Sequence, residues 1–277
     1  MSNPLQNYFR QPKIYIRLPS QGIYNKPGTI QGDVAKLPVF GLTGMDEMVL
    51  KTPDALLTGE STAKVVESCI PSIKDAWDIS SIDMNMILVA IRIATYGNIL
   101  SVGHTCSKCK SENDYDIDLV KTIDYFNTCQ YNSTIELEGL TIKLKPLTYK
   151  QISEFSLKNY QIQQQAAQLL RIPEDERTDE HNIQLQGLYT QLAQIQTDIY
   201  LNSVDSVQTD QVNVTEQKYI VEWLKNSDKV VFDTIKELSE KNVSAWIIPP
   251  AKVVCSSCSA ENQITIDIDQ SNFFVKA

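Results

Sequence analysis

The sequence predicts an α+β protein in which helices and small β-sheets form a core with an inserted antiparallel helical hairpin. Three observations predict this class. Short segments near both ends alternate apolar and polar residues, which indicates strands. A glutamine-rich middle segment repeats apolar residues every three or four positions, which indicates long helices. Two CxxC motifs lie far apart in the chain, which indicates one metal-binding element built from both.

The composition is typical of a folded protein with an acidic surface. The chain has 277 residues, 42% hydrophobic and 21% charged, enough for two domains or one elaborated domain. Its formal net charge of −9 argues against a broad basic face for nucleic acid. No segment reaches the roughly 18 apolar residues of a membrane span, and the N-terminus lacks the apolar core of a secretory signal. We therefore expect a cytosolic, reducing origin, no membrane partner, and cysteines that are thiols or metal ligands.

The first hundred residues predict short strands followed by helices. Lys13–Leu18 alternates apolar and polar residues as a strand does, and 34–40 is a second extended candidate. Ser61 is placed to cap a short helix. A longer helix is expected over 80–96, with Gly97 at its C-terminal end.

Residues 98–147 are rich in strand patterns. Tyr115, Ile117 and Leu119 alternate, and a second alternating run over 135–144 surrounds Glu138-Gly139, which predicts a β-hairpin.

Segment 148–202 predicts two antiparallel helices joined by a charged loop at 173–179. Each helix has one narrow stripe at three- and four-residue spacing: Ile152, Phe155, Asn159, Ile162, Ala166 and Leu169 in the first, and Leu185, Leu188, Leu192, Ile195 and Ile199 in the second. Because polar helices with narrow stripes pack mainly on each other, we expect a protruding hairpin with a coiled-coil-like seam. Two ordinary amphipathic helices lying against the core are the alternative.

Three parts of the chain follow from these patterns. They are an N-terminal α+β core (1–147), a helical insertion (148–245, with the hairpin at 148–202 and two helices in 215–242), and a C-terminal β segment (246–277) that packs back on 98–125.

The strongest local signal is a short internal repeat. Cys106-Ser-Lys-Cys109-Lys-Ser-Glu112-Asn113 and Cys255-Ser-Ser-Cys258-Ser-Ala-Glu261-Asn262 share the cysteines, the first serine and the Glu-Asn pair at identical offsets. Two cysteines three apart on a tight turn direct both sulfurs to one point, so each motif supplies half of a tetrahedral site. We predict a structural zinc ribbon with four cysteine ligands, Cys106, Cys109, Cys255 and Cys258. It would close a loop of 145 residues, 110–254.

Other interpretations of the cysteines stay open. A rubredoxin-type iron site uses the same four thiolates. Redox dithiols are disfavoured because both motifs precede polar loops and strands instead of starting a helix. His104 is close enough in sequence to replace a ligand, although four cysteines make this unnecessary. Cys69 and Cys129 are expected to be plain thiols.

No sequence pattern indicates catalysis. A four-thiolate site leaves no open metal position, and the sequence has neither a Gly-rich phosphate loop nor a GxSxG motif. We therefore expect a protein that is not an enzyme. Lys108 and Lys110 give the first motif a small positive spot, which keeps a nucleic-acid-binding zinc ribbon as a minor alternative.

Four motifs resemble the baseplate hub proteins of T-even-type contractile-tailed bacteriophages. They are 18–24 (LPSQGIY), 50–60 (LKTPDALLTGE, preceded by Asp46-Glu47), 91–97 (IRIATYG) and the paired CxxCxxEN motif. The resemblance is dense from about residue 10 to residue 120 and returns at the second cysteine motif. The segment 150–245 matches no motif of that family.

The resemblance implies a structural virion protein of the tail baseplate hub, assembled in the bacterial host cytoplasm. It implies partners among the other hub and tail proteins, with the tape-measure protein as a further candidate, and it brings no catalytic residues. Members of the family act as hub components or as assembly factors, so a transient chaperone for the tape-measure or hub protein is the alternative role. The threefold and sixfold symmetry of phage hubs leads us to expect a symmetric homo-oligomer.

Overall fold

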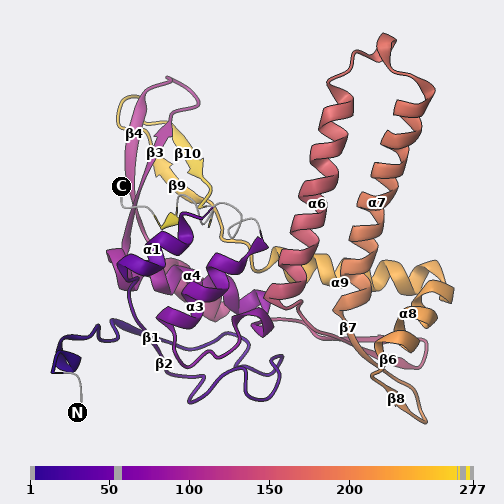
Figure 1. Cartoon of the computed structure of the whole chain (residues 1–277), viewed down its shortest axis with the longest axis horizontal. Helices are drawn as coiled ribbons and strands as arrows, with labels where there is room; N and C mark the ends of the chain where they lie inside the picture. The colour runs from indigo at the N-terminus through magenta and orange to yellow at the C-terminus, as the bar shows by residue number, and fades with distance from the viewer. Residues whose placement is uncertain (1–3, 53–57, 267, 269–272, 275–277) are drawn as a thin grey trace. The chain divides into compact units, whose positions relative to one another are not determined.

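The computed structural model describes residues 4–52, 58–266, 268 and 273–274. Two compact units contain the chain, one formed by 1–129 with 246–277 and the other by 130–245. Both combine helices with small antiparallel sheets, which confirms the predicted α+β class (Figure 1). Within the described residues, every helix is too short or too polar to cross a bilayer.

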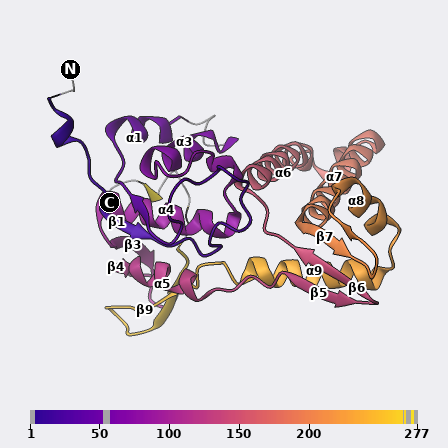
Figure 2. The same ribbon diagram turned by 90° about the horizontal axis from the view of Figure 1, so that it is seen from below.

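The first unit is built around one buried helix, α4 (Ser81–Tyr96). Its neighbours include α3 (Glu60–Cys69), the strand pair β1 (Ile14–Ile16) and β2 (Leu37–Val39), and α5 (Val120–Thr128). Figure 2 shows α3 and α5 on opposite sides of α4. Side chains on all sides of α4 are buried, including Met86, Ile87, Val89 and Ile91, which is the pattern of a helix at the centre of a core.

Shorter elements complete this unit. They are the 3-10 turns Gln6–Tyr8 and Ala76–Asp78, the helix α1 (Gly44–Leu50), and two antiparallel hairpins, β3 (Ile99–Thr105) with β4 (Glu112–Asp118) and β9 (Ala251–Val254) with β10 (Glu261–Ile264). Phe126 of α5 stacks on Trp246 with ring centroids 6.2 Å apart. This aromatic pair holds the start of the C-terminal segment against the N-terminal part of the same unit.

A four-stranded antiparallel sheet forms the base of the second unit. Its strands are β5 (Thr134–Leu137), β6 (Leu140–Leu144), β7 (Val204–Gln208) and β8 (Asn213–Val214), in that order. Glu138 and Gly139 have φ angles of 52° and 79°, so the predicted two-residue turn is the one observed between β5 and β6. Apolar residues of the sheet pack with α8 (Gln217–Asn226) and α9 (Lys229–Ser244) around Ile142 and Ile235, both fully buried.

The predicted helical hairpin is α6 (Tyr149–Leu170) and α7 (Asp179–Ser203), joined by a loop that contains the 3-10 turn Glu174–Glu176. Thr148 and Thr178 start the two helices with capping boxes. Most residues of the predicted stripes meet in a cluster of their own, which comprises Ile162, Ala166, Leu185, Leu188 and Ile195 with Phe155, Leu169, Leu192 and Ile199 around it. Figure 1 shows the loop end of the hairpin extending away from the sheet of its unit.

Two details differ from the sequence analysis. Residues 130–147, which the patterns placed with the N-terminal part, lie in the second unit because β6 pairs with β7, about sixty residues later in the chain. The N-cap of α3 is Gly59, with φ 80°, in place of Ser61. Ser61 instead donates its hydroxyl to the carbonyl of Val49, 2.8 Å away, so it joins α3 to the end of α1.

Candidate metal centre

The first CxxC motif is the turn between β3 and β4. The N–H of Cys106 donates to Ser111 O at 2.9 Å, and the N–H of Lys110 donates to Cys106 O at 3.0 Å. Lys110 closes the turn in the left-handed region, with φ 61°. These bonds fold the motif back on itself, so both of its sulfurs are held at one end of the hairpin.

The second motif repeats this geometry between β9 and β10. The N–H of Cys255 donates to Ala260 O at 2.9 Å, and the N–H of Ser259 donates to Cys255 O at 2.9 Å. Ser259 has φ 55°, as Lys110 does at the equivalent place. The sequence repeat is therefore a structural repeat, made of two copies of one metal-binding turn.

The four sulfur atoms of the two turns lie within 4.8 Å of one another. Cys106 Sγ is 3.7 Å from Cys258 Sγ, and Cys109 Sγ is 3.6 Å from Cys255 Sγ. A tetrahedron with metal–sulfur distances of about 2.3 Å has sulfur–sulfur edges of about 3.8 Å. The thiol cluster thus has the size that a tetrahedral zinc or iron site requires.

Hydrogen bonds between a serine and an asparagine join the two turns, once in each direction. Asn262 Oδ1 accepts from the N–H and the hydroxyl of Ser107, at 3.1 and 3.0 Å. Asn113 Oδ1 accepts from the N–H and the hydroxyl of Ser256, at 3.1 and 2.6 Å. Both asparagines are buried. The two hairpins therefore brace each other through equivalent residues of the repeat.

Two of the cysteines are surrounded by donors. The N–H groups of Cys109 and Lys108, followed by the Asn262 amide, lower the pKa of the Cys106 thiol below its ordinary value. A hydrogen bond from the Ser111 hydroxyl, together with the N–H groups of the second turn, lowers the pKa of Cys255 to about 5. Both cysteines are buried, so these donors replace the water that a thiolate loses.

Crowding of the four thiols disfavours the thiolate form of Cys258. The N–H of Ala260 lowers the pKa of Cys258, but contact with the other three thiols outweighs it and raises that pKa to about 12. Thiolates at this spacing repel one another, so four of them require positive charge in their midst. The donor set therefore fits a divalent cation with a preference for sulfur ligands.

All four predicted ligands meet in this cluster, and the other candidates lie apart from it. Within the part of the chain that the structure describes, His104, Cys69 and Cys129 belong to no group of potential metal ligands. Sequence reasoning missed the roles of the asparagines and the first serines of the motifs. Their identical offsets in both copies were the available signal, because a residue type repeated with the cysteines is expected to share their environment.

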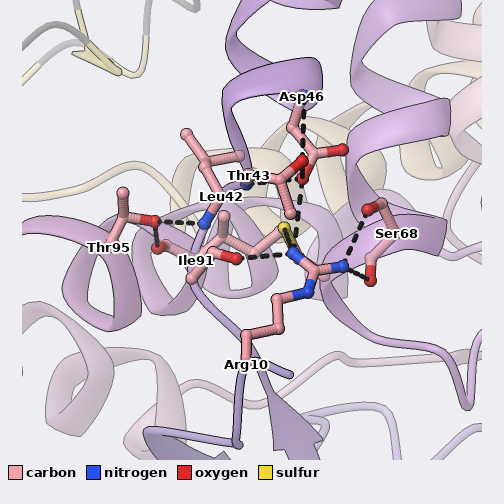
Figure 3. Close-up of polar contacts among 9 residues, drawn as sticks. Arg10, Leu42, Thr43, Asp46, Ser68, Ile91 and Thr95 are labelled. Atoms are coloured by element: carbon pink, nitrogen blue, oxygen red, sulfur yellow. Dashed lines mark hydrogen bonds and ion pairs between the residues drawn. The ribbon is translucent and has the colours of Figure 1, made fainter. Parts of the chain in front are cut away.

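Asp46, Ile91 and Thr95, which belong to the other motifs, take part in a polar cluster around Arg10 beside α1 (Figure 3). Arg10 Nη1 donates to Gly41 O at 2.6 Å and lies 3.3 Å from Asp46 Oδ2, while its Nη2 donates to Ser68 O at 2.6 Å. Asp46 also accepts from Thr43 in the capping box of α1. One arginine thus ties the N-terminal segment to the start of α1 and the end of α3.

The cluster continues to α4 through a threonine. Thr95 Oγ1 accepts from the N–H of Leu42 at 2.9 Å and donates to Ile91 O at 2.7 Å. Ile91 and Thr95 belong to the 91–97 motif. Residues of this motif therefore make structural contacts inside the first unit. Of the 50–60 motif, residues 53–57 lie outside the described part of the chain.

The 18–24 motif contacts the first turn of α4. Ser20 donates its N–H to Asp83 Oδ1 at 2.9 Å, and its hydroxyl donates to Asp83 Oδ2. Burial raises the pKa of Asp83 to about 6, although the two Ser20 hydrogen bonds act in the opposite direction. This pair secures the turn of the motif against the central helix.

Comparison with family models shows which family the chain resembles. The family model described as T4 bacteriophage base plate protein matches residues 42–275. No curated protein and no solved structure matches the chain. The matched range includes both cysteine motifs and all of the second unit.

Proposed function

Because this chain belongs to the T4 bacteriophage base plate protein family, we propose that it is a structural subunit of the baseplate hub in a contractile phage tail. It acts in baseplate and tail assembly through contacts with other hub and tail proteins, and it is not an enzyme. The observation that carries the proposal is the family match across both units and both cysteine motifs.

We further propose that Cys106, Cys109, Cys255 and Cys258 hold one structural zinc ion. Zinc would supply the positive charge that four neighbouring thiolates need, and it would tie the β9–β10 hairpin to the β3–β4 hairpin. With four protein ligands no coordination position is left for a substrate, which supports a structural role. Iron is the alternative metal, since the same ligands suit it.

The helical hairpin is the proposed contact arm for partner proteins. The apolar residues of the hairpin pack between α6 and α7. The two helices therefore stabilise each other without a partner protein. Tyr160, Ile183 and Tyr189 are exposed on the outer faces of the two helices. Candidate partners are other hub and tail proteins, the tape-measure protein, and further copies of this chain in a symmetric ring.

Quantitative mass spectrometry of purified phage particles, beside assembly intermediates from infected cells, tests the structural role. A fixed small number of copies in every finished particle is the expected result. Presence in the intermediates alone would contradict a hub subunit and identify a transient assembly chaperone.

A further inference from the structure

We infer that Asn113 and Asn262 are positioning residues of the metal centre, each holding the metal-binding turn of the opposite hairpin and donating to one of its ligand sulfurs. This inference rests on the proposed metal site. It goes beyond that site because it assigns metal retention to residues that are not ligands.

Each amide makes the same main contacts, and Asn113 Nδ2 makes one more, to the Ser111 hydroxyl at 3.3 Å. Asn113 Nδ2 donates to Ser111 O at 3.0 Å on its own turn and lies 3.6 Å from Cys255 Sγ on the other. Asn262 Nδ2 donates to Ala260 O at 3.1 Å and lies 3.6 Å from Cys106 Sγ. Each amide oxygen accepts from the N–H and the hydroxyl of the opposite serine. An asparagine side chain offers two donors and one oxygen with two lone pairs, and all of them are used here.

The two sulfurs that receive these amides are the buried ones. Cys106 and Cys255 are 0% and 1% exposed, whereas Cys109 is exposed and Cys258 is partly exposed. Water can solvate the exposed thiolates but not the buried ones, so their charge depends on N–H donors of the protein. The asparagines are therefore placed at the ligands that need them most.

The asparagines align two turns that are each formed by their own hairpin. Each hairpin shapes its own CxxC turn with backbone hydrogen bonds, but each turn is fixed relative to the other by the partner's asparagine. Loss of one amide leaves all four cysteines in place and removes half of the hydrogen bonds that align the two pairs. Residues that orient metal ligands in this way typically change metal affinity by about 10–100-fold when replaced.

The test compares the full chain with Asn113→Ala and Asn262→Ala in zinc titrations against a chromogenic chelator. Each variant is expected to bind zinc about 10–100-fold more weakly than the wild type, because each amide contacts the opposite serine and one buried sulfur. In the cobalt-substituted protein, the sulfur-to-cobalt charge-transfer band is expected to move to lower energy in each variant, since a sulfur without its N–H donor gives up an electron more easily.

Asn242→Ala is the matched control, because Asn242 is a buried asparagine that bridges the backbone of Asn132 in the second unit. It is expected to lower the melting temperature without changing zinc affinity or the cobalt band. Ser107→Ala and Ser256→Ala remove only hydroxyl donors, and they are expected to weaken zinc binding by less than the asparagine variants. They keep the test decisive if an alanine at 113 or 262 prevents folding.

The outcomes separate this inference from the proposed function. Wild-type zinc affinity and an unmoved cobalt band in the asparagine variants would overturn the inference alone. Wild-type protein that binds neither metal would overturn the proposed metal site and the inference together.

Discussion

The sulfur atoms of Cys109 and Cys255 lie 3.6 Å apart although 145 residues separate them in the chain. Cys109 lies in the β3–β4 hairpin and Cys255 in the β9–β10 hairpin, and both hairpins belong to the first unit. Everything between β4 and β9 is thus enclosed in a loop that a metal at the four thiols would close. Closing so long a loop restricts the unfolded chain, so the metal is expected to contribute to stability as well as to local order.

Replacing Cys255 by Ser is expected to release the metal and to loosen the β9–β10 hairpin. Three thiolates leave the site incomplete, and binding energy of a structural metal is folding energy. Hydrogen exchange should show faster exchange at 251–264 and a lower melting temperature for the whole chain. Cys129→Ser is the control, because Cys129 lies outside the thiol cluster. Equal metal content and equal exchange in Cys255→Ser and wild type would refute the link between the two hairpins.

The Ser20–Asp83 pair predicts a pH dependence of stability. Burial raises the pKa of Asp83 to about 6 in the folded protein, above its value of about 3.9 in an unfolded chain. The stability that this group contributes is therefore fully present below pH 4 and is lost as the pH rises through about 6. In urea titrations, the free energy of unfolding of wild type should fall by about 2 kcal/mol relative to that of Asp83→Asn between pH 4 and pH 7.

The companion variant is Ser20→Ala, which removes the hydroxyl donor to Asp83. Loss of that donor is expected to raise the pKa of Asp83 further, so that the decline in stability extends to higher pH. A stability difference between wild type and Asp83→Asn that stays constant from pH 4 to pH 7 would contradict the buried pair.

Arg10→Ala is expected to lower the free energy of unfolding by about 1–3 kcal/mol. The substitution leaves the carbonyls of Gly41 and Ser68 without this donor and removes the ion pair to Asp46. Denaturant unfolding measures the effect, with Arg17→Ala as the control, since Arg17 is exposed on the neighbouring segment. If both variants unfold at the same denaturant concentration as wild type, Arg10 does not stabilise the N-terminal segment.

Two glycines are expected to respond oppositely to alanine. Gly187 is exposed within α7, and an added Cβ would meet nothing within 4 Å. Gly187→Ala should therefore stabilise the hairpin by about 0.5–1 kcal/mol. A Cβ on Gly41 would lie 2.8 Å from the carbonyl oxygen of Ala94, so Gly41→Ala should destabilise the first unit. Thermal unfolding monitored by circular dichroism compares them, and a destabilising Gly187→Ala would contradict the open position in α7.

Local patterns were sufficient for the elements whose partners lie close in sequence. The stripes that start at Ile152 and Leu185 face each other because only a short loop separates their helices. Glu138-Gly139 forms its turn for the same reason. The cysteine repeat predicted a contact across the whole chain, because the geometry of a four-ligand site demands that two half-sites meet.

Non-local pairing explains what the sequence did not reveal. Nothing in 134–144 indicates that β6 will pair with β7, so sequence patterns alone do not assign this hairpin to the second unit. No local sequence pattern indicates that Arg10 will contact Ser68 or that Asp83 will contact Ser20. Asn113 and Asn262 were visible as repeated residues, but only the structure shows that each contacts the opposite turn.

Metal analysis of the intact chain shows whether one metal ion joins the two hairpins. The protein would be purified without chelators, and native mass spectrometry would be combined with elemental analysis. We expect one zinc ion per chain in wild type and none in Cys255→Ser. A wild-type chain that carries no metal would contradict this expectation, and one iron ion in place of zinc would correct the identity of the metal.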